Sequence, residues 1–173
     1  MGTASSRRAP GAPIPILFTH YGEDWIRGSE RCLLDLLAHL DPGRFRPVVW
    51  CNAPSLEREV ARLGLPVHRS RFSILFNWER PRWDLRGYLH QVAEGRRLVR
   101  HYGIRVLHCN GGAPAQWLVP VGCFEHRPVL VHLHAPYVER DRFLLLLHQA
   151  TLAVGVTQGC LQGLLMDGMP PTA

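Results

Sequence analysis

Apolar positions along the chain follow two periods, and each period predicts a different element. Short apolar runs bounded by glycine, proline or polar residues are typical of buried β-strands. Segments in which apolar residues recur every three or four positions predict amphipathic helices. The predicted strands are residues 14–20, 46–52, 65–69, 105–109, 128–134 and 152–156, and the predicted helices are residues 29–40, 55–63, 87–102, 113–124, 139–149 and 158–166.

Strands and helices therefore alternate over nearly the whole chain, which indicates a parallel sheet with right-handed crossovers. Six such strands predict a Rossmann-like, three-layer α/β fold, with a mostly parallel sheet in the order 3-2-1-4-5-6 and helices on both faces. Local signals agree with the helix boundaries. Ser29 is a suitable N-cap for the first helix, Gly103 suits the end of the third, and Pro120 interrupts the fourth.

Polar side chains stand at the carboxyl ends of three predicted strands. His20 ends the first strand, Asn110 and Gly111 follow the fourth, and His132 and His134 end the fifth. The assumed strand order places the first and fourth strands side by side, where the winding of the sheet reverses. Open α/β sheets bind their ligands at that crevice. We therefore expect these side chains to meet there.

Composition narrows the class of protein. The chain has 173 residues, of which 46% are hydrophobic and 20% charged, and this indicates one globular domain. All 20 basic residues are arginine and the net charge is +6. Coding bias explains such a preference, and a surface that binds phosphate or anionic lipid is the functional alternative. No basic run accompanies an RNA- or DNA-binding motif, so nucleic acid is not an expected partner.

The five cysteines do not form a recognisable framework. Their number is odd and no CxxC motif occurs, so we expect reduced thiols in a cytosolic protein. Cys32, Cys51 and Cys109 fall inside apolar elements and are expected to be buried. No apolar stretch reaches the length needed to cross a bilayer.

The loop at residues 21–28 leads from the first strand into a helix N-terminus. Unpaired N–H groups and the helix dipole make such an end suitable for an anion, and glycine lets a phosphate approach the backbone. Arg27, Gly28 and Ser29 are therefore candidate substrate-binding residues, with a plain turn and cap as the alternative. The loop lacks the GxGxxG fingerprint, which disfavours a nicotinamide oxidoreductase, and no cofactor is expected.

The other candidates lie at the ends of the fourth and fifth strands. Asn110 and Gly111 can offer an amide and backbone donors to a sugar or phosphate, or form a tight turn. His132 and His134 are two residues apart and point to the same side of a strand. A third ligand at suitable spacing is not apparent, so no metal is expected, and a Cys–His nucleophile has no visible third member. A buried structural role competes with ligand contact at His132, whereas ligand contact is favoured at His134.

Residues 70–87 form an irregular segment in which aromatic residues alternate with arginines. Three interpretations stay open: a flap packed on the core, an apolar wall for an acceptor substrate, or a surface that rests on a membrane. The aromatic residues are Phe72, Phe76, Trp78 and Trp83, and the arginines are Arg71, Arg80, Arg82 and Arg86.

Taken in order, six segments give the chain a family resemblance. They read RGSERCLLDLL, LDPGRFRPVVWC, GLPVHR, IRVLHCNGG, PVLVHLHAPY and LAVGVTQGCLQGLL, and they extend over roughly residues 14–170. In this order and spacing the chain resembles the N-terminal domain of retaining GT-B glycosyltransferases of family four, which use nucleotide-sugar donors.

The resemblance implies roles for individual residues. The glycine-rich loop of the family usually reads Gly-Gly-Ala-Glu and lies against the donor phosphate and the acceptor. Gly28 and Glu30 match that loop, while Arg27 and Ser29 replace its first glycine and its alanine. The family's histidine after the fifth strand contacts the transferred sugar, and His134 matches it. His134 is therefore the expected catalytic residue.

The resemblance also implies a domain organisation. Residues 14–167 would form the acceptor-side domain, residues 1–13 a disordered tail, and residues 168–173 the start of an interdomain linker. The donor-binding domain of the family has no counterpart in this sequence, so we expect the chain to be inactive alone.

The implied partners are a nucleotide-sugar donor, held mainly by that second domain, and an unknown hydroxyl acceptor such as a lipid or polysaccharide. The expected location is cytoplasmic, with peripheral contact to the inner membrane face. The alternative is a non-catalytic Rossmann-like binding or regulatory module.

Overall fold

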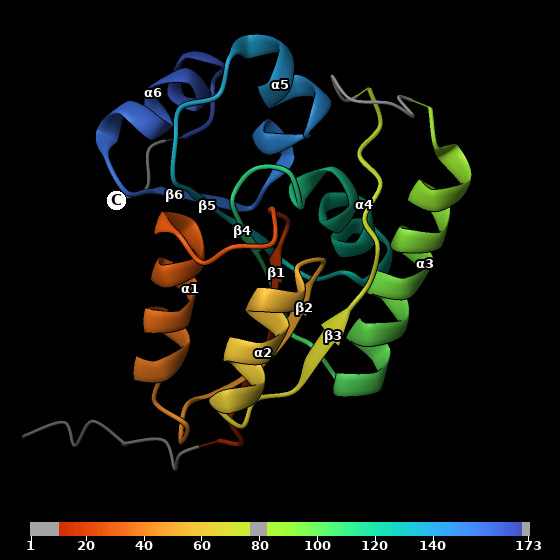
Figure 1. Cartoon of the computed structure of the whole chain (residues 1–173). Helices are drawn as coiled ribbons and strands as arrows, with labels where there is room; N and C mark the ends of the chain where they lie inside the picture. The colour runs from red at the N-terminus through yellow and green to blue at the C-terminus, as the bar shows by residue number, and fades with distance from the viewer. Residues whose placement is uncertain (1–10, 77–82, 171–173) are drawn as a thin grey trace, which may run out of the picture.

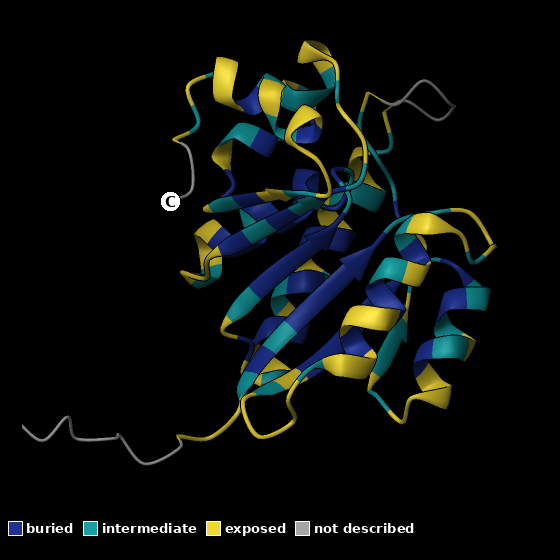
Figure 2. Ribbon diagram, turned by 90° about the vertical axis from the view of Figure 1, so that its left-hand side faces the viewer, coloured by how far each residue is buried: buried dark blue, intermediate teal, exposed yellow. Residues whose placement is uncertain are grey.

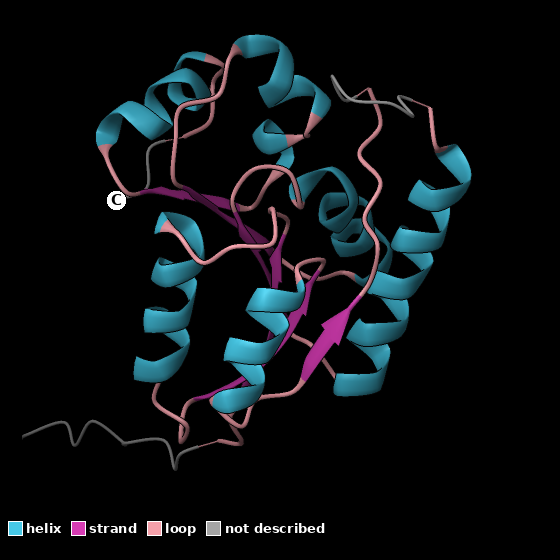
Figure 3. Ribbon diagram, viewed as in Figure 1, coloured by secondary structure: helices cyan, strands magenta, loops and turns pink. Residues whose placement is uncertain are grey.

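The computed structural model describes residues 11–76 and 83–170. Strands and helices alternate along this part of the chain, as Figures 1 and 3 show. The elements are β1 (Ile14–His20), α1 (Gly28–His39), β2 (Phe45–Cys51), α2 (Pro54–Arg62), β3 (Val67–Arg69), α3 (Leu85–Tyr102), β4 (Val106–Asn110), α4 (Ala115–Glu125), β5 (Val129–Leu133), α5 (Glu139–Leu144), a 3-10 turn (Leu147–Gln149), β6 (Leu152–Gly155) and α6 (Gln158–Met166).

The strands form one sheet in the order β3-β2-β1-β4-β5-β6, and every strand pairing is parallel. This confirms the predicted Rossmann-like α/β fold and its strand order. Chain connections reverse direction between β1 and β4, so the carboxyl ends of these two strands border the same crevice. The carboxyl end of β5 lies next to that of β4.

A separate apolar core covers each face of the sheet, because neighbouring residues of a strand point to opposite faces. On β1, Phe18 joins the core formed with α1 and α2, while Leu17 joins the larger core formed with α3 and α4. Trp50 and Trp117, both fully buried, fill the larger core. Figure 2 shows the central strands buried along most of their length.

Several predicted boundaries need correction. The predicted single helix over residues 139–149 is wrong, because Leu146 has a φ of +59° and a right-handed helix cannot continue through it. The N-cap of α1 is Arg27 and not Ser29, since the first helical hydrogen bond runs from Arg31 N to Arg27 O at 2.8 Å. Cys32 is half-buried and not buried, because it lies at the edge of the α1 face that packs on the sheet. Cys51 and Cys109 are fully buried, as predicted.

The segment at residues 70–87 is described only in part, since residues 77–82, with Trp78, Arg80 and Arg82, lie outside the described residues. Its beginning packs on the core: the Phe72 ring lies 5.0 Å from that of Trp50 and 4.8 Å from that of Trp117. Trp83, at the other end, is 74% exposed and its ring contacts that of Phe76. The predicted tail falls mostly on residues 1–10, which also lie outside. Over the described residues, no helix combines the length and apolarity needed to cross a membrane.

The predicted interruption of the fourth helix at Pro120 is wrong. Helix α4 continues through Pro120 because another residue replaces the hydrogen bond that proline cannot make. Pro120 has no N–H to donate to the carbonyl of Gln116, four residues earlier. The hydroxyl of Tyr88, on α3, donates to that carbonyl at 2.9 Å. Proline therefore costs α4 little at this position, and the bond also fastens α3 to α4.

The Tyr88 hydroxyl thus takes the place of the N–H that Pro120 lacks. Replacing Tyr88 with Phe is expected to lower the free energy of unfolding by about 1–2 kcal/mol, because the Gln116 carbonyl then has no donor. In a Pro120→Ala background the backbone N–H returns, so the same replacement should cost less than about 0.5 kcal/mol. Urea unfolding of the four proteins measures both costs, and equal costs in the two backgrounds would contradict this account.

Candidate functional site at the strand ends

The ends of β1, β4 and β5 lie side by side, as expected from the strand order. The register pairs His20 of β1 with Asn110 of β4, and Asn110 with His132 of β5. His134 follows β5 by one residue and its ring centroid lies 4.4 Å from that of His132. The three polar strand ends predicted from sequence therefore meet at one place.

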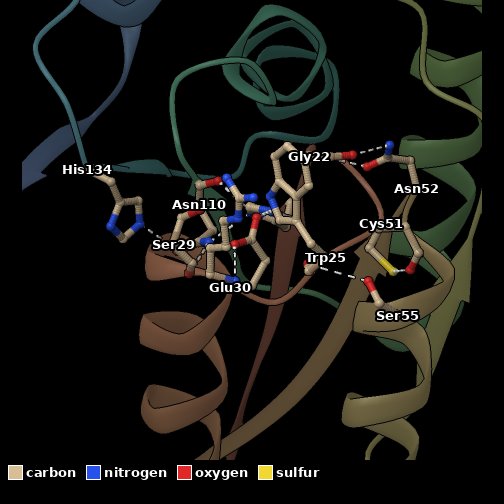
Figure 4. Close-up of polar contacts among 12 residues, drawn as sticks. Gly22, Trp25, Ser29, Glu30, Cys51, Asn52, Ser55, Asn110 and His134 are labelled. Carbon is tan, nitrogen blue, oxygen red and sulfur yellow. Dashed lines mark hydrogen bonds and ion pairs between the residues drawn. The ribbon is translucent and has the colours of Figure 1, made fainter.

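The Asn110 side chain connects these strand ends to α1. Its amide nitrogen lies 3.0 Å from the Ser29 carbonyl oxygen and 2.9 Å from His20 Nδ1, and its amide oxygen lies 2.9 Å from His134 Nε2. A carbonyl oxygen only accepts, so the amide nitrogen must be the atom that faces Ser29. His134 therefore donates its Nε2–H to Asn110, and its Nδ1 keeps a free lone pair. Figure 4 shows Asn110 close to Ser29 and His134.

His20 and Glu30 form a buried pair behind Asn110. Because His20 Nδ1 accepts from the Asn110 amide, its Nε2–H donates to Glu30 Oε1, at 2.8 Å. Nδ1 also lies 3.1 Å from the main-chain oxygen of Asn110. In this tautomer Nδ1 carries no hydrogen, so it does not donate to that oxygen. The second carboxylate oxygen of Glu30 accepts from Arg27 N at 3.0 Å.

The environment of Glu30 keeps this side chain ionised, although it is only 3% exposed. Burial alone would raise the pKa of its carboxyl. The backbone N–H groups of Glu30 and Arg27, and then the neighbouring His20, act in the opposite direction and hold that pKa below its ordinary value. A buried carboxylate thus stands behind the N-terminus of α1.

The loop between β1 and α1 is held over this buried pair. Gly22 N donates to Asn52 Oδ1 at 3.0 Å, and Asn52 Nδ2 donates to Gly22 O at 2.7 Å. A Cβ added to Gly22 would lie 2.7 Å from His20 Nε2 and 2.9 Å from Glu30 Oε1. Glycine is therefore needed where the loop crosses the pair. Figure 4 shows Gly22 beside Asn52.

The end of this loop is open. The Arg27 guanidinium carbon lies 3.9 Å from the centroid of the Trp25 ring, an arrangement typical of a cation–π contact. A Cβ added to Gly28 would meet no heavy atom within 4 Å. The protein itself therefore does not demand glycine at position 28, and space for a ligand is left at the first residue of α1.

Three histidines on the neighbouring strands are held neutral. Burial lowers the pKa of His132, and burial followed by the nearby His132 and His20 lowers the pKa of His134. His108 lies behind them, with its ring centroid 5.9 Å from that of His132. Burial, then His132 and His134, lower the pKa of His108 to about 3. At neutral pH these rings can form hydrogen bonds or bind metal ions, but they carry little charge.

The two glycines after β4 have a structural role in the turn that follows this strand. Gly111 has a φ of +99°, which favours glycine, and its N–H donates to His132 O at 2.8 Å. The next residue, Gly112, donates its N–H to the hydroxyl of Tyr137 at 2.9 Å. These N–H groups are thus already bonded within the protein. The direct substrate contacts expected from Asn110 and Gly111, and those of the other sequence candidates, stay predictions.

Sequence reasoning missed the buried pair and the position of Cys32. Glu30 stands three residues after the helix N-cap, a spacing typical of a capping box, and that signal could have revealed its bond to Arg27. Nothing local could have paired Glu30 with His20. Cys32 lies near His132 and His134, a proximity that only the packing of α1 against the end of β5 creates.

Comparison with known proteins gives a match in fold. No known family profile matches the sequence. No curated protein matches it either. Solved structures do match, among them Anabaena Alr3699/HepE in complex with UDP, with 18% identity, a TM-score of 0.68, and coverage of 91% of this chain and 42% of that chain.

Two other solved structures match in the same way. The lipopolysaccharide outer core galactosyltransferase WaaB is 10% identical, with a TM-score of 0.70 and coverage of 91% of this chain and 43% of that chain. A putative UDP-N-acetylglucosamine 2-epimerase from Listeria monocytogenes is 11% identical, with a TM-score of 0.67 and coverage of 93% and 44%. The chain thus spans less than half the length of these proteins. It has the fold of a Rossmann-like unit found in GT-B glycosyltransferases and epimerases.

Proposed function

We propose that the chain is the acceptor-side, N-terminal half of a family-four-like GT-B glycosyltransferase. This half-enzyme would move a sugar from a nucleotide-sugar donor to a hydroxyl acceptor. The observation that carries the proposal is the hydrogen-bonded network in which Asn110 joins His134, His20 and the first turn of α1. The fold shared with HepE and WaaB supports it, since one of these proteins binds UDP and the other is a galactosyltransferase.

The N-terminus of α1 suits the leaving group of such a reaction. The first N–H groups of a helix have no acceptor within the helix, and the helix dipole adds partial positive charge there. Gly28 leaves open space beside these groups, and Arg27, the N-cap residue, holds its guanidinium over the Trp25 ring. A diphosphate that gains charge as the sugar departs is stabilised by such fixed donors. Arg27, Gly28 and Ser29 are the residues assigned to it.

His134 is assigned to the sugar. Its Nε2–H is bonded to Asn110, so the ring is fixed and Nδ1 is the atom left to accept a hydrogen bond from a sugar hydroxyl. His132 lies beside it and is assigned a contact on the same side. A neutral imidazole orients the sugar and does not act as the nucleophile. The acceptor hydroxyl attacks the anomeric carbon, the bond from that carbon to the diphosphate breaks, and the hydroxyl proton passes to the departing diphosphate.

The remaining assignments follow from a two-domain enzyme. A second domain would hold most of the donor nucleotide, so the 173-residue chain alone would be inactive. The acceptor would be a lipid or polysaccharide. The enzyme would work in the cytoplasm at the inner membrane face, with exposed Trp83, Leu85 and Leu89 available for peripheral contact.

The test compares the isolated chain with the longest natural protein that contains it. Both are incubated with UDP-glucose, UDP-galactose and UDP-N-acetylglucosamine and with an extract of cell lipids and polysaccharides. We expect acceptor-dependent release of UDP from the longer protein and none above background from the isolated chain. Conversion of one nucleotide sugar into another without UDP release would identify an epimerase instead. Absence of both reactions would overturn the proposal in favour of a non-catalytic module.

A variant of Gly28 makes the same assay specific for the α1 N-terminus. Gly28→Ala should change the free energy of unfolding by less than about 1 kcal/mol, since the added methyl meets no protein atom. It should raise the KM for the donor by about tenfold, because the methyl occupies space assigned to the phosphate. Gly159→Ala, near the start of α6, is the matched control and should leave KM unchanged. An unchanged KM in Gly28→Ala would show that the donor phosphate does not bind at this position.

A further inference from the structure

Cys32, His132 and His134 come together between α1 and the end of β5, and each offers one ligand atom. These three atoms, a thiol sulfur and two imidazole nitrogens, all lie within 4.8 Å of one another. In a tetrahedral zinc site with Zn–S and Zn–N bonds of roughly 2.3 and 2.0 Å, neighbouring ligand atoms are about 3.5 Å apart. The three atoms therefore have to approach one another by at most about 1.3 Å for Zn²⁺ to bind.

The hydrogen bonds around the cluster leave a lone pair for a cation. His134 donates Nε2–H to Asn110, so its Nδ1 carries the free lone pair. Metal-binding histidines typically donate their other ring N–H to an oxygen in this way, which fixes the tautomer and the ring orientation. Asn110 is itself fixed by the carbonyl of Ser29, in the first turn of the helix that carries Cys32.

The kinds of donor define the class of cation. One thiolate and two imidazoles suit Zn²⁺, while Mg²⁺ and Ca²⁺ prefer oxygen donors, which this cluster does not supply. Three protein ligands are the number found in zinc sites that keep a fourth position for water or another molecule. All three residues are half-buried, so a cation can reach them from solvent.

We propose that Cys32, His132 and His134 form a binding site for Zn²⁺, with solvent as the fourth ligand. The proposal goes beyond sugar transfer and does not require it. It also departs from the expectation that no metal binds, because Cys32 supplies the third ligand that is not apparent from spacing along the sequence. If both proposals hold, Zn²⁺ and the sugar compete for Nδ1 of His134.

The experiment measures binding to the chelator-treated, reduced chain by titration calorimetry with ZnCl₂ and by absorption spectroscopy with CoCl₂. We expect one Zn²⁺ per chain with a dissociation constant of about 1 µM or below. Co²⁺ should produce a sulfur-to-cobalt charge-transfer band. Cys32→Ser should abolish this band, and His132→Ala and His134→Ala should each weaken Zn²⁺ binding by about 100-fold. Asn110→Ala, which leaves the three ligands in place but removes the hydrogen-bond partner of His134 together with the bonds to His20 and Ser29, should weaken it by about tenfold.

The chain offers matched controls for these variants. Cys123→Ser and His90→Ala remove an exposed thiol and an exposed imidazole away from the cluster, and both should bind as the unmodified chain does. Circular dichroism confirms that each variant is folded. The proposal is overturned if the unmodified chain shows no charge-transfer band, if the band survives in Cys32→Ser, or if the control variants lose binding equally. None of these readouts depends on an activity, so sugar transfer can fail while zinc binding holds, and the reverse.

Discussion

Replacing Asn110 with Ala is expected to lower the free energy of unfolding by about 3 kcal/mol, the largest loss we expect from a single polar side chain of this protein. Asn110 is 1% exposed, and its amide makes three hydrogen bonds, to the Ser29 carbonyl, to His20 Nδ1 and to His134 Nε2. Each such bond contributes about 1 kcal/mol net, and a buried partner left without one costs more. Part of this cost is recovered because Ser29 and His134 are half-buried and can meet water.

Two further variants separate the hydrogen bonds of Asn110 from its volume. Asn110→Asp keeps the shape but places an oxygen against the Ser29 carbonyl, so it should be at least as destabilising as Asn110→Ala. Asn52→Ala is the control, because Asn52 makes two hydrogen bonds to Gly22 in a less buried position. It should cost only about 1 kcal/mol.

Unfolding by urea and by heat is monitored by circular dichroism. For a chain of this size a loss of about 3 kcal/mol lowers the melting temperature by about 6–12 °C. A cost below about 1 kcal/mol for Asn110→Ala would mean that the strand ends are held together by packing alone. The network would then no longer explain how His134 is fixed.

The sheet could be predicted from sequence because each strand carries its own signal. The bounds predicted for β1 and α6 agree with the structure, and the other strands differ by only a few residues. The burial of a central parallel strand on both faces leaves an uninterrupted apolar run, which is readable without its neighbours. The strand order was assumed from the common doubly wound arrangement, since alternation and right-handed connections also allow other orders, and the structure confirms it.

The side-chain contacts of the site could not be predicted in the same way. His20 and Asn110 are 90 residues apart, and their hydrogen bond depends on the register of β1 against β4. The sequence therefore suggested a substrate contact for Asn110, whereas the structure shows all its amide contacts directed to the protein. The break of the predicted helix at Leu146 could not be predicted either, because leucine rarely adopts a positive φ and nothing in the sequence marks this position.

If the proposed sugar transfer holds, replacing His134 with Ala is expected to reduce kcat of the proposed two-domain glycosyltransferase by about 100-fold, which corresponds to a loss of about 2.7 kcal/mol in transition-state stabilisation. The ring is fixed by Asn110 through Nε2, and Nδ1 is the atom assigned to the sugar. A hydroxyl that is positioned through one fixed acceptor loses that alignment when the acceptor is removed. The donor KM should change less, because most of the donor would be held elsewhere.

Two conservative variants distinguish a contact with the sugar from a purely structural role. The amide of Gln can reach the place of Nε2, so His134→Gln should preserve the bond to Asn110 and the stability, yet lose activity as Ala does. The amide of Asn can reach the place of Nδ1, so His134→Asn should lose the bond to Asn110 but retain part of the activity. His90→Ala, an exposed imidazole on α3, is the control and should be fully active.

The assay is acceptor-dependent UDP release in the presence of a chelator, so that a metal at Cys32, His132 and His134 cannot mask Nδ1. The order of activity expected is native, then Asn, then Gln and Ala. The opposite order, with Gln close to native and Asn inactive, would show that His134 acts only through Asn110. In that case the ring supports the strand ends and another residue contacts the sugar, and His132 would be the next candidate because its ring lies beside that of His134.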